Sequence, residues 1–331
     1  MNTYENNSNS THIHNVKMSS TWEQFAWIYY YVNPSETKRS TFYSKNDHII
    51  NDKEFCQWLV GITDGDGSFS FIKNKNGSWN FTFKIGQSNY NLRLLYYIKS
   101  KIKVGSVSIT NSKDNCAEYR IRNINHIIQC IIPVFDNYIL LTKKYYNYIK
   151  FKDAINIYIK ESNNKDNIMI KIKNKTCSKD YISPAWSVIN YNIDNIDNIN
   201  KVISKSWLVG FTEAEGSFYI TKKDKDRMVH AFEITQKHDY IVIKAISIIL
   251  SANLTFKKNH YSVNTTNKNS INIIINYFFK SIKGIKSLEY RIWARSFNKK
   301  KNINIEYMIN IRNIMREIRS IRFDKNFKIK E

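Results

Sequence analysis

The amino-acid sequence predicts an α+β fold in which one unit is present twice. The phrase WLVGITDGDGSF at residues 58–69 recurs as WLVGFTEAEGSF at residues 207–218, so that position 66 corresponds to position 215, an offset of 149. The same offset relates FKIGQ at 83–87 to FEITQ at 232–236. A repeat that keeps its register over this distance indicates a duplicated domain.

Each repeated phrase is predicted to be the end of a helix. Asn51, with a glutamate three residues later, forms a candidate capping box, and apolar residues follow at helical spacing. Either Ser204 or Ser206 can cap the second helix. Gly67 and Gly216 are predicted to stop the two helices in the left-handed conformation.

A separate face of each predicted helix carries small residues. They are Gly61 and Gly65 in the first helix, and Gly210 and Ala214 in the second. Small residues four positions apart allow two helix backbones to approach closely. We therefore expect the two helices to pack side by side along these faces.

That packing would bring Asp66 and Glu215 together at the helix C-termini. The helix dipoles and the mutual repulsion of the carboxylates both disfavour this arrangement. A divalent cation removes the conflict, and Mg²⁺ binds one or two carboxylates together with water and phosphate oxygens. Acids that only solvate a helix end would explain one copy but not two matched copies. Asp64 and Glu213 are predicted to have a structural role through local hydrogen bonds.

Alternating polar and apolar residues predict strands after each phrase, with helices between them. Each unit is therefore expected to run helix, hairpin, helix, hairpin, helices. The predicted strands are 68–72, 79–85, 106–110 and 118–122 in the first unit and 217–220, 229–234, 254–258 and 261–265 in the second, and the intervening helices are 91–101 and 240–250.

The composition is strongly basic. The 331 residues include 51 Lys and Arg against 28 Asp and Glu, for a formal net charge of +23, and the isoelectric point is about 9.6. Such an excess suits a polyanion, although the codon usage of an AT-rich genome would explain part of it. A two-stranded ribbon fits the major groove of DNA, whereas any single lysine is equally consistent with a solvated sheet face. The candidate DNA-binding residues are Lys73, Lys75, Lys84, Arg120, Arg122, Lys222, Lys223, Arg227, Lys237, Lys257 and Lys258.

Four segments are predicted along the chain. They are an N-terminal extension at 1–50, partly disordered; a first unit at 51–160; a polar linker at 161–200; and a second unit at 201–331. The four cysteines lack CxxC spacing and clustered histidines, which argues against a zinc site or a disulfide framework. The longest apolar run is too short to span a bilayer, so no membrane association is expected.

The two repeated phrases resemble the defining motif of the LAGLIDADG homing endonucleases, in the two-motif single-chain class encoded by mobile group I introns. The resemblance implies two αββαββα units related by a pseudo-twofold axis, whose antiparallel sheets form a DNA-binding saddle. It implies that Asp66 and Glu215 bind catalytic Mg²⁺ or Mn²⁺, and that Gln87 and Gln236 lie near the scissile phosphates. It also implies a lysine that helps to activate water; Lys144 and Lys286 occupy comparable places, with Lys143 and Lys283 as competitors.

This resemblance implies a site-specific endonuclease that makes a metal-dependent double-strand break in a long DNA target. The chain would act as a monomer with internal pseudo-twofold symmetry on double-stranded DNA. An alternative is an RNA maturase that assists splicing of its own group I intron, alone or together with cleavage. A DNA-binding repressor would leave the paired acids unexplained. The AT-rich composition favours a mitochondrial protein encoded in the organelle.

Overall fold

The computed structural model of the chain describes residue 50 and residues 52–110, 115–160, 164–299 and 304–321. Except for residue 50, the predicted N-terminal extension lies outside these ranges, and so does Asn51. Within the described residues the predicted α+β class and the two repeated units are confirmed.

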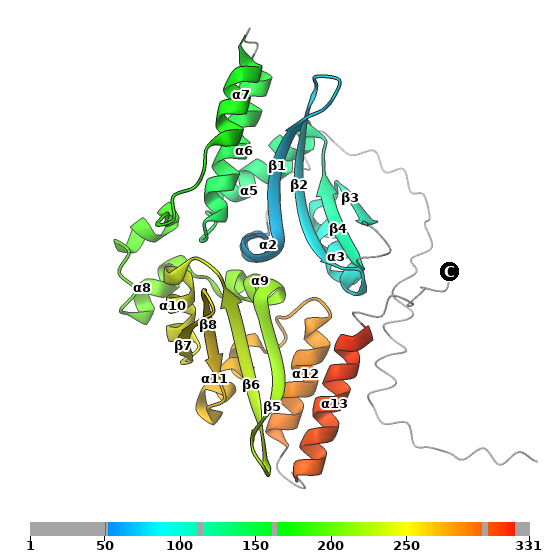
Figure 1. Ribbon diagram of the computed structural model, residues 1–331, viewed down its shortest axis with the longest axis vertical. Helices are drawn as coiled ribbons and strands as arrows, with labels where there is room; N and C mark the ends of the chain where they lie inside the picture. The colour runs from blue at the N-terminus through cyan, green and yellow to red at the C-terminus, as the bar shows by residue number, and fades with distance from the viewer. Residues whose placement is uncertain (1–49, 51, 111–114, 161–163, 300–303, 322–331) are drawn as a thin grey trace, which may run out of the picture. The chain divides into compact units, whose positions relative to one another are not determined.

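The first unit follows the predicted order of elements. A helix leads into a hairpin, a second helix leads into a second hairpin, and further helices close the unit (Figure 1). Its elements are α2 (Lys53–Asp66), β1 (Gly67–Lys73), β2 (Trp79–Ser88), η1 (Asn89–Asn91), α3 (Leu92–Ile102), β3 (Ser106–Ile109), β4 (Cys116–Ile121), α4 (Ile124–His126), the π-helical turn η2 (Ile127–Ile131), α5 (Ile132–Asn137) and α6 (Lys144–Ile159).

The second unit repeats this order of elements. Its elements are α9 (Lys205–Glu215), β5 (Gly216–Asp224), β6 (Arg227–Gln236), α10 (Tyr240–Ile249), β7 (Asn253–Lys257), β8 (His260–Thr265), α11 (Lys268–Phe278), α12 (Lys286–Asn298) and α13 (Ile305–Ile321). All eight predicted strands and both intervening helices are present, with ends that shift by at most four residues.

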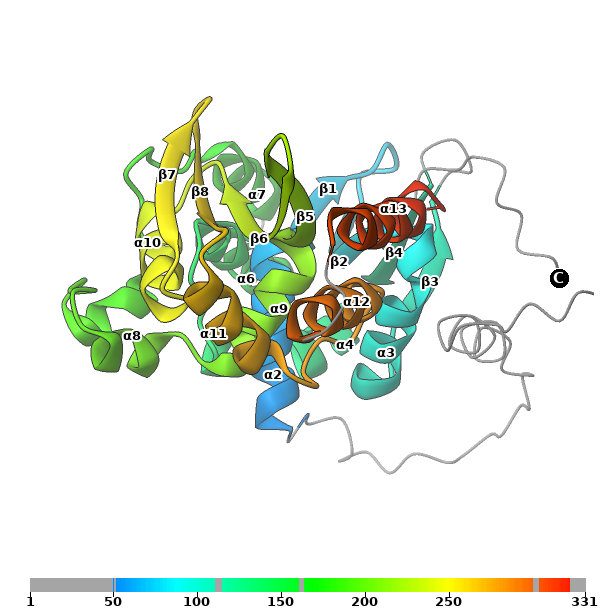
Figure 2. The same cartoon turned by 90° about the horizontal axis from the view of Figure 1, so that it is seen from below.

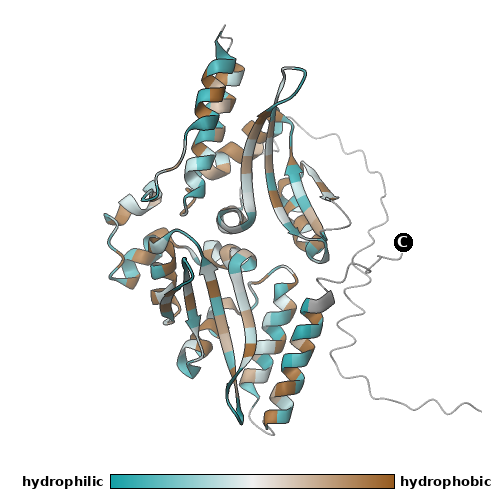
Figure 3. Ribbon diagram, viewed as in Figure 1, coloured by the Kyte–Doolittle hydropathy of each residue, from teal (hydrophilic) through white to brown (hydrophobic). Residues whose placement is uncertain are grey.

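Each unit contains one antiparallel four-stranded sheet. The strand orders are β1-β2-β4-β3 and β5-β6-β8-β7, so the two sheets have the same topology. Phe83 lies opposite Phe69 in the first sheet, and Phe232 lies opposite Phe218 in the second. These equivalent pairs place the aromatic side chains on the helix-covered face of each sheet, where α6 packs on β1 and α12 and α13 pack on β5. Figure 3 shows bands of polar and apolar residues along the strands. Because side chains alternate along a strand, polar residues line the opposite face.

The segment between the two units is more ordered than a polar linker. It contains α7 (Lys165–Asn174), η3 (Pro184–Ile189) and α8 (Ile196–Val202). Trp186 is fully buried and donates a hydrogen bond from Nε1 to the carbonyl of Leu141 at 3.0 Å. The segment therefore packs onto the first unit through an aromatic anchor.

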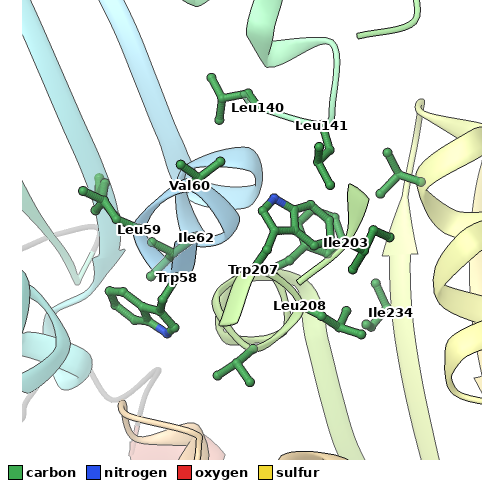
Figure 4. Packing of buried hydrophobic residues seen from close by; sticks show 14 of the residues in the cluster. Trp58, Leu59, Val60, Ile62, Leu140, Leu141, Ile203, Trp207, Leu208 and Ile234 are labelled. Carbon is green, nitrogen blue, oxygen red and sulfur yellow. The ribbon is translucent and has the colours of Figure 1, made fainter. Parts of the chain in front are cut away.

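Helices α2 and α9 pack directly against each other at the centre of the described structure (Figures 2 and 4). A Cβ on Gly61 would lie 2.0 Å from the carbonyl oxygen of Trp207, and one on Gly210 would lie 2.1 Å from that of Trp58. The reciprocal contacts show that the backbones touch at equivalent places. The expected packing along the small faces is therefore present.

Two predictions about the ends of these helices need correction. The N-cap of α2 is Asp52, which accepts a hydrogen bond from the N–H of Phe55, rather than Asn51; Ser204 caps α9. Gly67 and Gly216 are extended, with φ of −80° at both and ψ of 159° and 153°, so neither adopts the left-handed conformation. The chain passes from helix to strand without a turn, and a side chain at Gly67 would collide with Thr63 at 2.5 Å.

Candidate active site at two helix ends

Asp66 and Glu215 are the last residues of α2 and α9, and strands begin at the next residue in both units. The two ends are adjacent, because a Cβ on Gly65 would lie 2.2 Å from that of Ala214 and 3.4 Å from Glu215 Oε1. Burial raises the pKa of Glu215, and the negative charge of Asp66 raises it further. The two carboxylates therefore lie close enough to repel each other.

A glutamine contacts each carboxylate. Gln87 donates a hydrogen bond from Nε2 to Asp66 Oδ2. Gln236 makes the equivalent but longer contact, 3.5 Å from Nε2 to Glu215 Oε1. Gln87 is the residue before the last of β2, and Gln236 is the last residue of β6. By strand alternation, both side chains lie on the same face as the buried residues of their strands, which directs them toward the helix ends.

A lysine from the helix that follows each sheet also reaches these ends. Lys144 is the first residue of α6 and donates from Nζ to the carbonyl of Gly65 at 2.6 Å. Lys286 is the first residue of α12 and donates from Nζ to the carbonyl of Gly216 at 2.6 Å. Burial lowers the pKa of Lys144, while the charges of neighbouring carboxylates, Asp66 and Glu215 among them, oppose this shift.

The competing lysines point elsewhere. Lys143 donates from Nζ to the carbonyl of Lys179, and Lys283 places Nζ 5.8 Å from the ring centre of Tyr97. The structure therefore brings Lys144 and Lys286 to the paired carboxylates and leaves their neighbours outside.

Asp64 and Glu213 are buried and hold the loops that carry these lysines. Asp64 accepts from the N–H groups of Leu141 at 2.9 Å and Thr142 at 3.2 Å. Glu213 accepts from the N–H of Gly284 at 2.9 Å and from that of the preceding residue. Burial raises the pKa of Asp64 to about 6. The sequence predicted local hydrogen bonds for these two acids. The observed bonds are long-range instead, because they span about seventy residues or more.

The candidate DNA-binding residues divide into three groups. Those on the polar faces, by strand alternation, are Lys84 and Arg120 in the first unit and Arg227 and Lys257 in the second. Those in connections between elements are Lys75, Arg122, Lys237 and Lys258, and Lys223 lies at a bulge of β5. Those on the helix-covered side are Lys73 and Lys222. The polar faces therefore receive only part of the predicted set.

Several of these cations already have acidic partners. Glu118 lies on the polar face of the first sheet, 2.9 Å from Arg120 and 3.4 Å from Lys84. Lys73 forms an ion pair with Asp166 of α7 at 2.7 Å, which explains its place on the helix-covered side. Lys73 is therefore a contact to the segment between the units.

Two side chains that the sequence patterns did not single out connect the units. Asp239 accepts a hydrogen bond from the N–H of Lys143 at 2.7 Å, and Asn91 accepts one from the N–H of Ile285 at 3.0 Å. The sequence signal that could have identified them is their position, because Asp239 lies three residues after one repeated glutamine and Asn91 four residues after the other.

The donor set at the helix ends fits a hard divalent cation. Among the described residues there is no cluster of three or more His, Cys, Asp or Glu side chains that could hold a metal ion. Asp66 and Glu215 supply two carboxylates, and Mg²⁺ characteristically binds one or two while keeping water and phosphate ligands. Burial and then the negative charge of Asp66 raise the pKa of Glu215, and a cation bound there would oppose both effects.

Fold and site together define a single chain of two similar α+β units whose paired helices end in adjacent carboxylates. The family model for LAGLIDADG endonuclease matches residues 59–155 and 208–297. The chain belongs to this family.

Named relatives agree with this assignment. The probable intron-encoded endonuclease Cox1-I1b of Schizosaccharomyces pombe is 38% identical over 283 residues, covering 80% of this chain and 69% of that protein. The probable intron-encoded endonuclease aI3 of Kluyveromyces lactis is 30% identical over 266 residues, covering 73% of this chain and 65% of that protein.

A solved structure shares the fold. I-SmaMI, bound to an uncleaved DNA target in the presence of calcium ions, superposes with a TM-score of 0.61 at 22% identity, over 81% of this chain and 97% of that one. In the described part of the present chain, no helix is long and apolar enough to cross a membrane.

Proposed function

We propose that the protein is a site-specific, divalent-metal-dependent DNA endonuclease that promotes homing of a group I intron. The observation that carries this proposal is the pairing of Asp66 and Glu215 at touching helix ends, with a glutamine at each carboxylate and a lysine on a backbone carbonyl at each helix end. Its family membership, the names of its relatives and the DNA-bound structural neighbour support the same activity. The reported relatives are named as endonucleases, which favours cleavage over a maturase role.

Double-stranded DNA would lie along the polar faces of the two sheets. Arg227 and Lys257 extend from the polar face of the second sheet, and Arg120 from that of the first. Cations on such a face neutralise phosphates, and polar side chains between them can contact base edges in the major groove. Because the two units differ in sequence, each sheet can recognise a different half-site.

Asp66 and Glu215 would hold Mg²⁺ or Mn²⁺. A metal ion bound there would supply an activated water molecule and would stabilise negative charge on the leaving oxygen. Gln87 and Gln236 are placed to orient water beside the carboxylates.

Lys144 and Lys286 are placed to neutralise charge that develops on the phosphate. Each ammonium group is held at the end of a motif helix by a backbone carbonyl, so no reorganisation is needed when charge develops. Burial lowers the pKa of Lys144, which brings this ammonium closer to the range in which it can release a proton from Nζ. Each unit would contribute one carboxylate, one glutamine and one lysine, and this set would cut one DNA strand.

A mitochondrial location, with the reading frame inside an organellar intron, is part of the proposal. It rests on the AT-rich composition, in which Asn, Lys, Ile and Tyr are abundant, and on relatives that are named as intron-encoded.

The carboxylate pair can be tested directly. We expect Asp66→Asn combined with Glu215→Gln to lower Mg²⁺-dependent cleavage of a plasmid carrying the intronless exon junction by at least ~1,000-fold, as for groups that act as one catalytic unit. Binding to the same DNA in Ca²⁺ should remain within about threefold of wild type, because the fold and the sheet surfaces are unchanged.

The matched control removes two exposed acids. Asp194→Asn combined with Glu306→Gln changes the net charge equally at sites outside the paired helices and should cleave like wild type. If the Asp66/Glu215 variant cuts at the wild-type rate, the proposed site is wrong.

A further inference from the structure

The loops that carry Lys144 and Lys286 are held by the same pattern of hydrogen bonds. In each loop, two consecutive N–H groups donate to the buried acid of the same unit, Asp64 or Glu213. The next N–H group belongs to the residue directly before the lysine, and it donates to a side chain other than this acid. The two loops are therefore equivalent although the 149-residue offset is lost between them.

The partner of this third N–H group comes from the opposite unit. Lys143, next to Lys144, donates to Asp239 of the second unit at 2.7 Å. Ile285, next to Lys286, donates to Asn91 of the first unit at 3.0 Å. The same exchange occurs in both directions, as expected for two units related by a pseudo-twofold axis.

Asp239 and Asn91 also occupy equivalent places within their units. Each is the N-cap of the helix that follows the second strand, α10 or α3, and neither side chain accepts a hydrogen bond from its own helix. Capping by Asp or Asn normally stabilises a helix. Both side chains thus forgo their usual role and contact the opposite loop.

The surroundings fix these two side chains in place. Asn91 is 5% exposed and also donates from Nδ2 to Gln87 Oε1 at 2.8 Å. Asp239 has φ of 66°, a left-handed conformation that Asp and Asn tolerate better than most residues. Burial also raises the pKa of Asp239, to about 6. Asn91 and Asp239 are therefore held by particular partners and by burial, unlike helix caps that are exposed to solvent.

We propose that Asp239 and Asn91 are cross-unit positioning residues, each of which holds the lysine loop of the opposite unit. Asp239 thereby governs the strand cut with Lys144, and Asn91 governs the strand cut with Lys286. Each anchored N–H group belongs to the residue directly before the lysine whose Nζ reaches the helix end. A displacement of about 1 Å at a reacting group can lower a rate by about 100-fold.

This inference rests on the proposed endonuclease function and is tested by following the two DNA strands separately. The substrate is a supercoiled plasmid carrying the intronless exon junction. Lys144→Met and Lys286→Met serve as references, each slowing a different strand and accumulating a nicked circle. Strand-specific primer extension then identifies which strand remains intact.

Asp239→Gly removes the carboxylate while retaining a residue that adopts φ of 66° without strain. We expect at least tenfold slower cutting of the strand that Lys144→Met slows, with the other strand within about twofold of wild type. Asp239→Asn keeps an oxygen that accepts from Lys143 and should restore cutting to within about threefold. A general loss of stability would slow both strands together.

The matched control is Asn190→Gly, which replaces an exposed residue with φ of 51° outside the candidate site. It should cut both strands like wild type. Asn91→Ala should slow the strand that Lys286→Met slows; the other strand can slow as well, because Asn91 also contacts Gln87.

The outcomes separate this inference from the proposed function. If wild type leaves the plasmid intact, or the lysine references cut both strands normally, the proposed function or its lysines are wrong. If the references nick as described but Asp239→Gly cuts both strands at equal rates, the cross-unit role is refuted. It is also refuted if Asn91→Ala slows only the strand assigned to Lys144.

Discussion

Trp58 and Trp207 occupy equivalent positions in the two motif helices but have different polar environments. Trp207 donates from Nε1 to Oδ2 of Asp64 at 2.8 Å, so the buried acid of the first unit gains a bond from the second unit. Among the described residues, the buried Nε1 of Trp58 and Oε2 of Glu213 have no hydrogen-bond partner. The two halves are therefore alike in packing but differ in how their buried polar atoms are satisfied.

This difference predicts unequal effects of one substitution. Trp207→Phe and Trp58→Phe remove the same atoms from nearly fully buried sites, so their packing losses should be similar. Only Trp207→Phe removes one of the donors to a buried carboxylate, which should cost about 1–3 kcal/mol more in the free energy of unfolding. Urea denaturation of both variants measures this difference. Equal losses would show that the bond to Asp64 contributes nothing to stability.

The residues that carry the candidate site differ in how far the sequence could predict them. Asp66, Glu215, Gln87 and Gln236 were placed by a repeat that keeps its register. The lysines could not be chosen from adjacent residues, because the start of a helix decides which one faces the carboxylates. Asn91 and Asp239 were missed because their partners lie in the opposite unit, and contacts between units have no period in the sequence.

At the scale of elements, the α2–α9 contact depends on the absence of a side chain at two glycines. Gly61→Ala places a Cβ 2.0 Å from a backbone oxygen, which cannot move aside as the end of a flexible side chain can. We expect a loss of more than ~3 kcal/mol in the free energy of unfolding. Thermal or urea unfolding provides the measurement.

Gly86 offers the matched control for this substitution. It lies in a strand, and a Cβ there meets no described atom within 4 Å. Gly86→Ala should therefore change stability by less than about 1 kcal/mol. If Gly61→Ala is tolerated equally well, the helices are not held at backbone contact in solution.

Strands were easier to predict than the elements between the units. Alternation of polar and apolar residues located all eight strands, because each sheet buries only one face. The helices at 165–174 and 196–202 lie in a polar stretch whose single large anchor, Trp186, gives no periodic signal. The left-handed conformation expected at Gly67 was wrong, because glycine is required there to avoid Thr63 while the backbone stays extended.

At the scale of the whole molecule, the formal charge of +23 predicts how DNA binding responds to salt. The logarithm of the binding constant should fall linearly with the logarithm of the salt concentration, with a slope of about −0.9 for each phosphate neutralised. Arg227→Ala combined with Lys257→Ala should make this slope less steep by about 1–2. Fluorescence anisotropy across a salt series in Ca²⁺ measures it.

Lys73→Ala is the control for this measurement. Lys73 has the same charge but lies on the helix-covered side, paired with Asp166. Its removal should leave the slope unchanged. A change equal to that of the double variant would mean that net charge, rather than the polar sheet face, determines binding.

The direct passage from helix to strand at residues 66–67 and 215–216 has a consequence for the spacing of the two cuts. Because the helix backbones touch, the distance between the two carboxylates is fixed. This distance would determine the number of base pairs between the two nicks, whereas the sheets would determine which target is bound. A variant of either sheet could therefore acquire a new target and still leave ends of the same length.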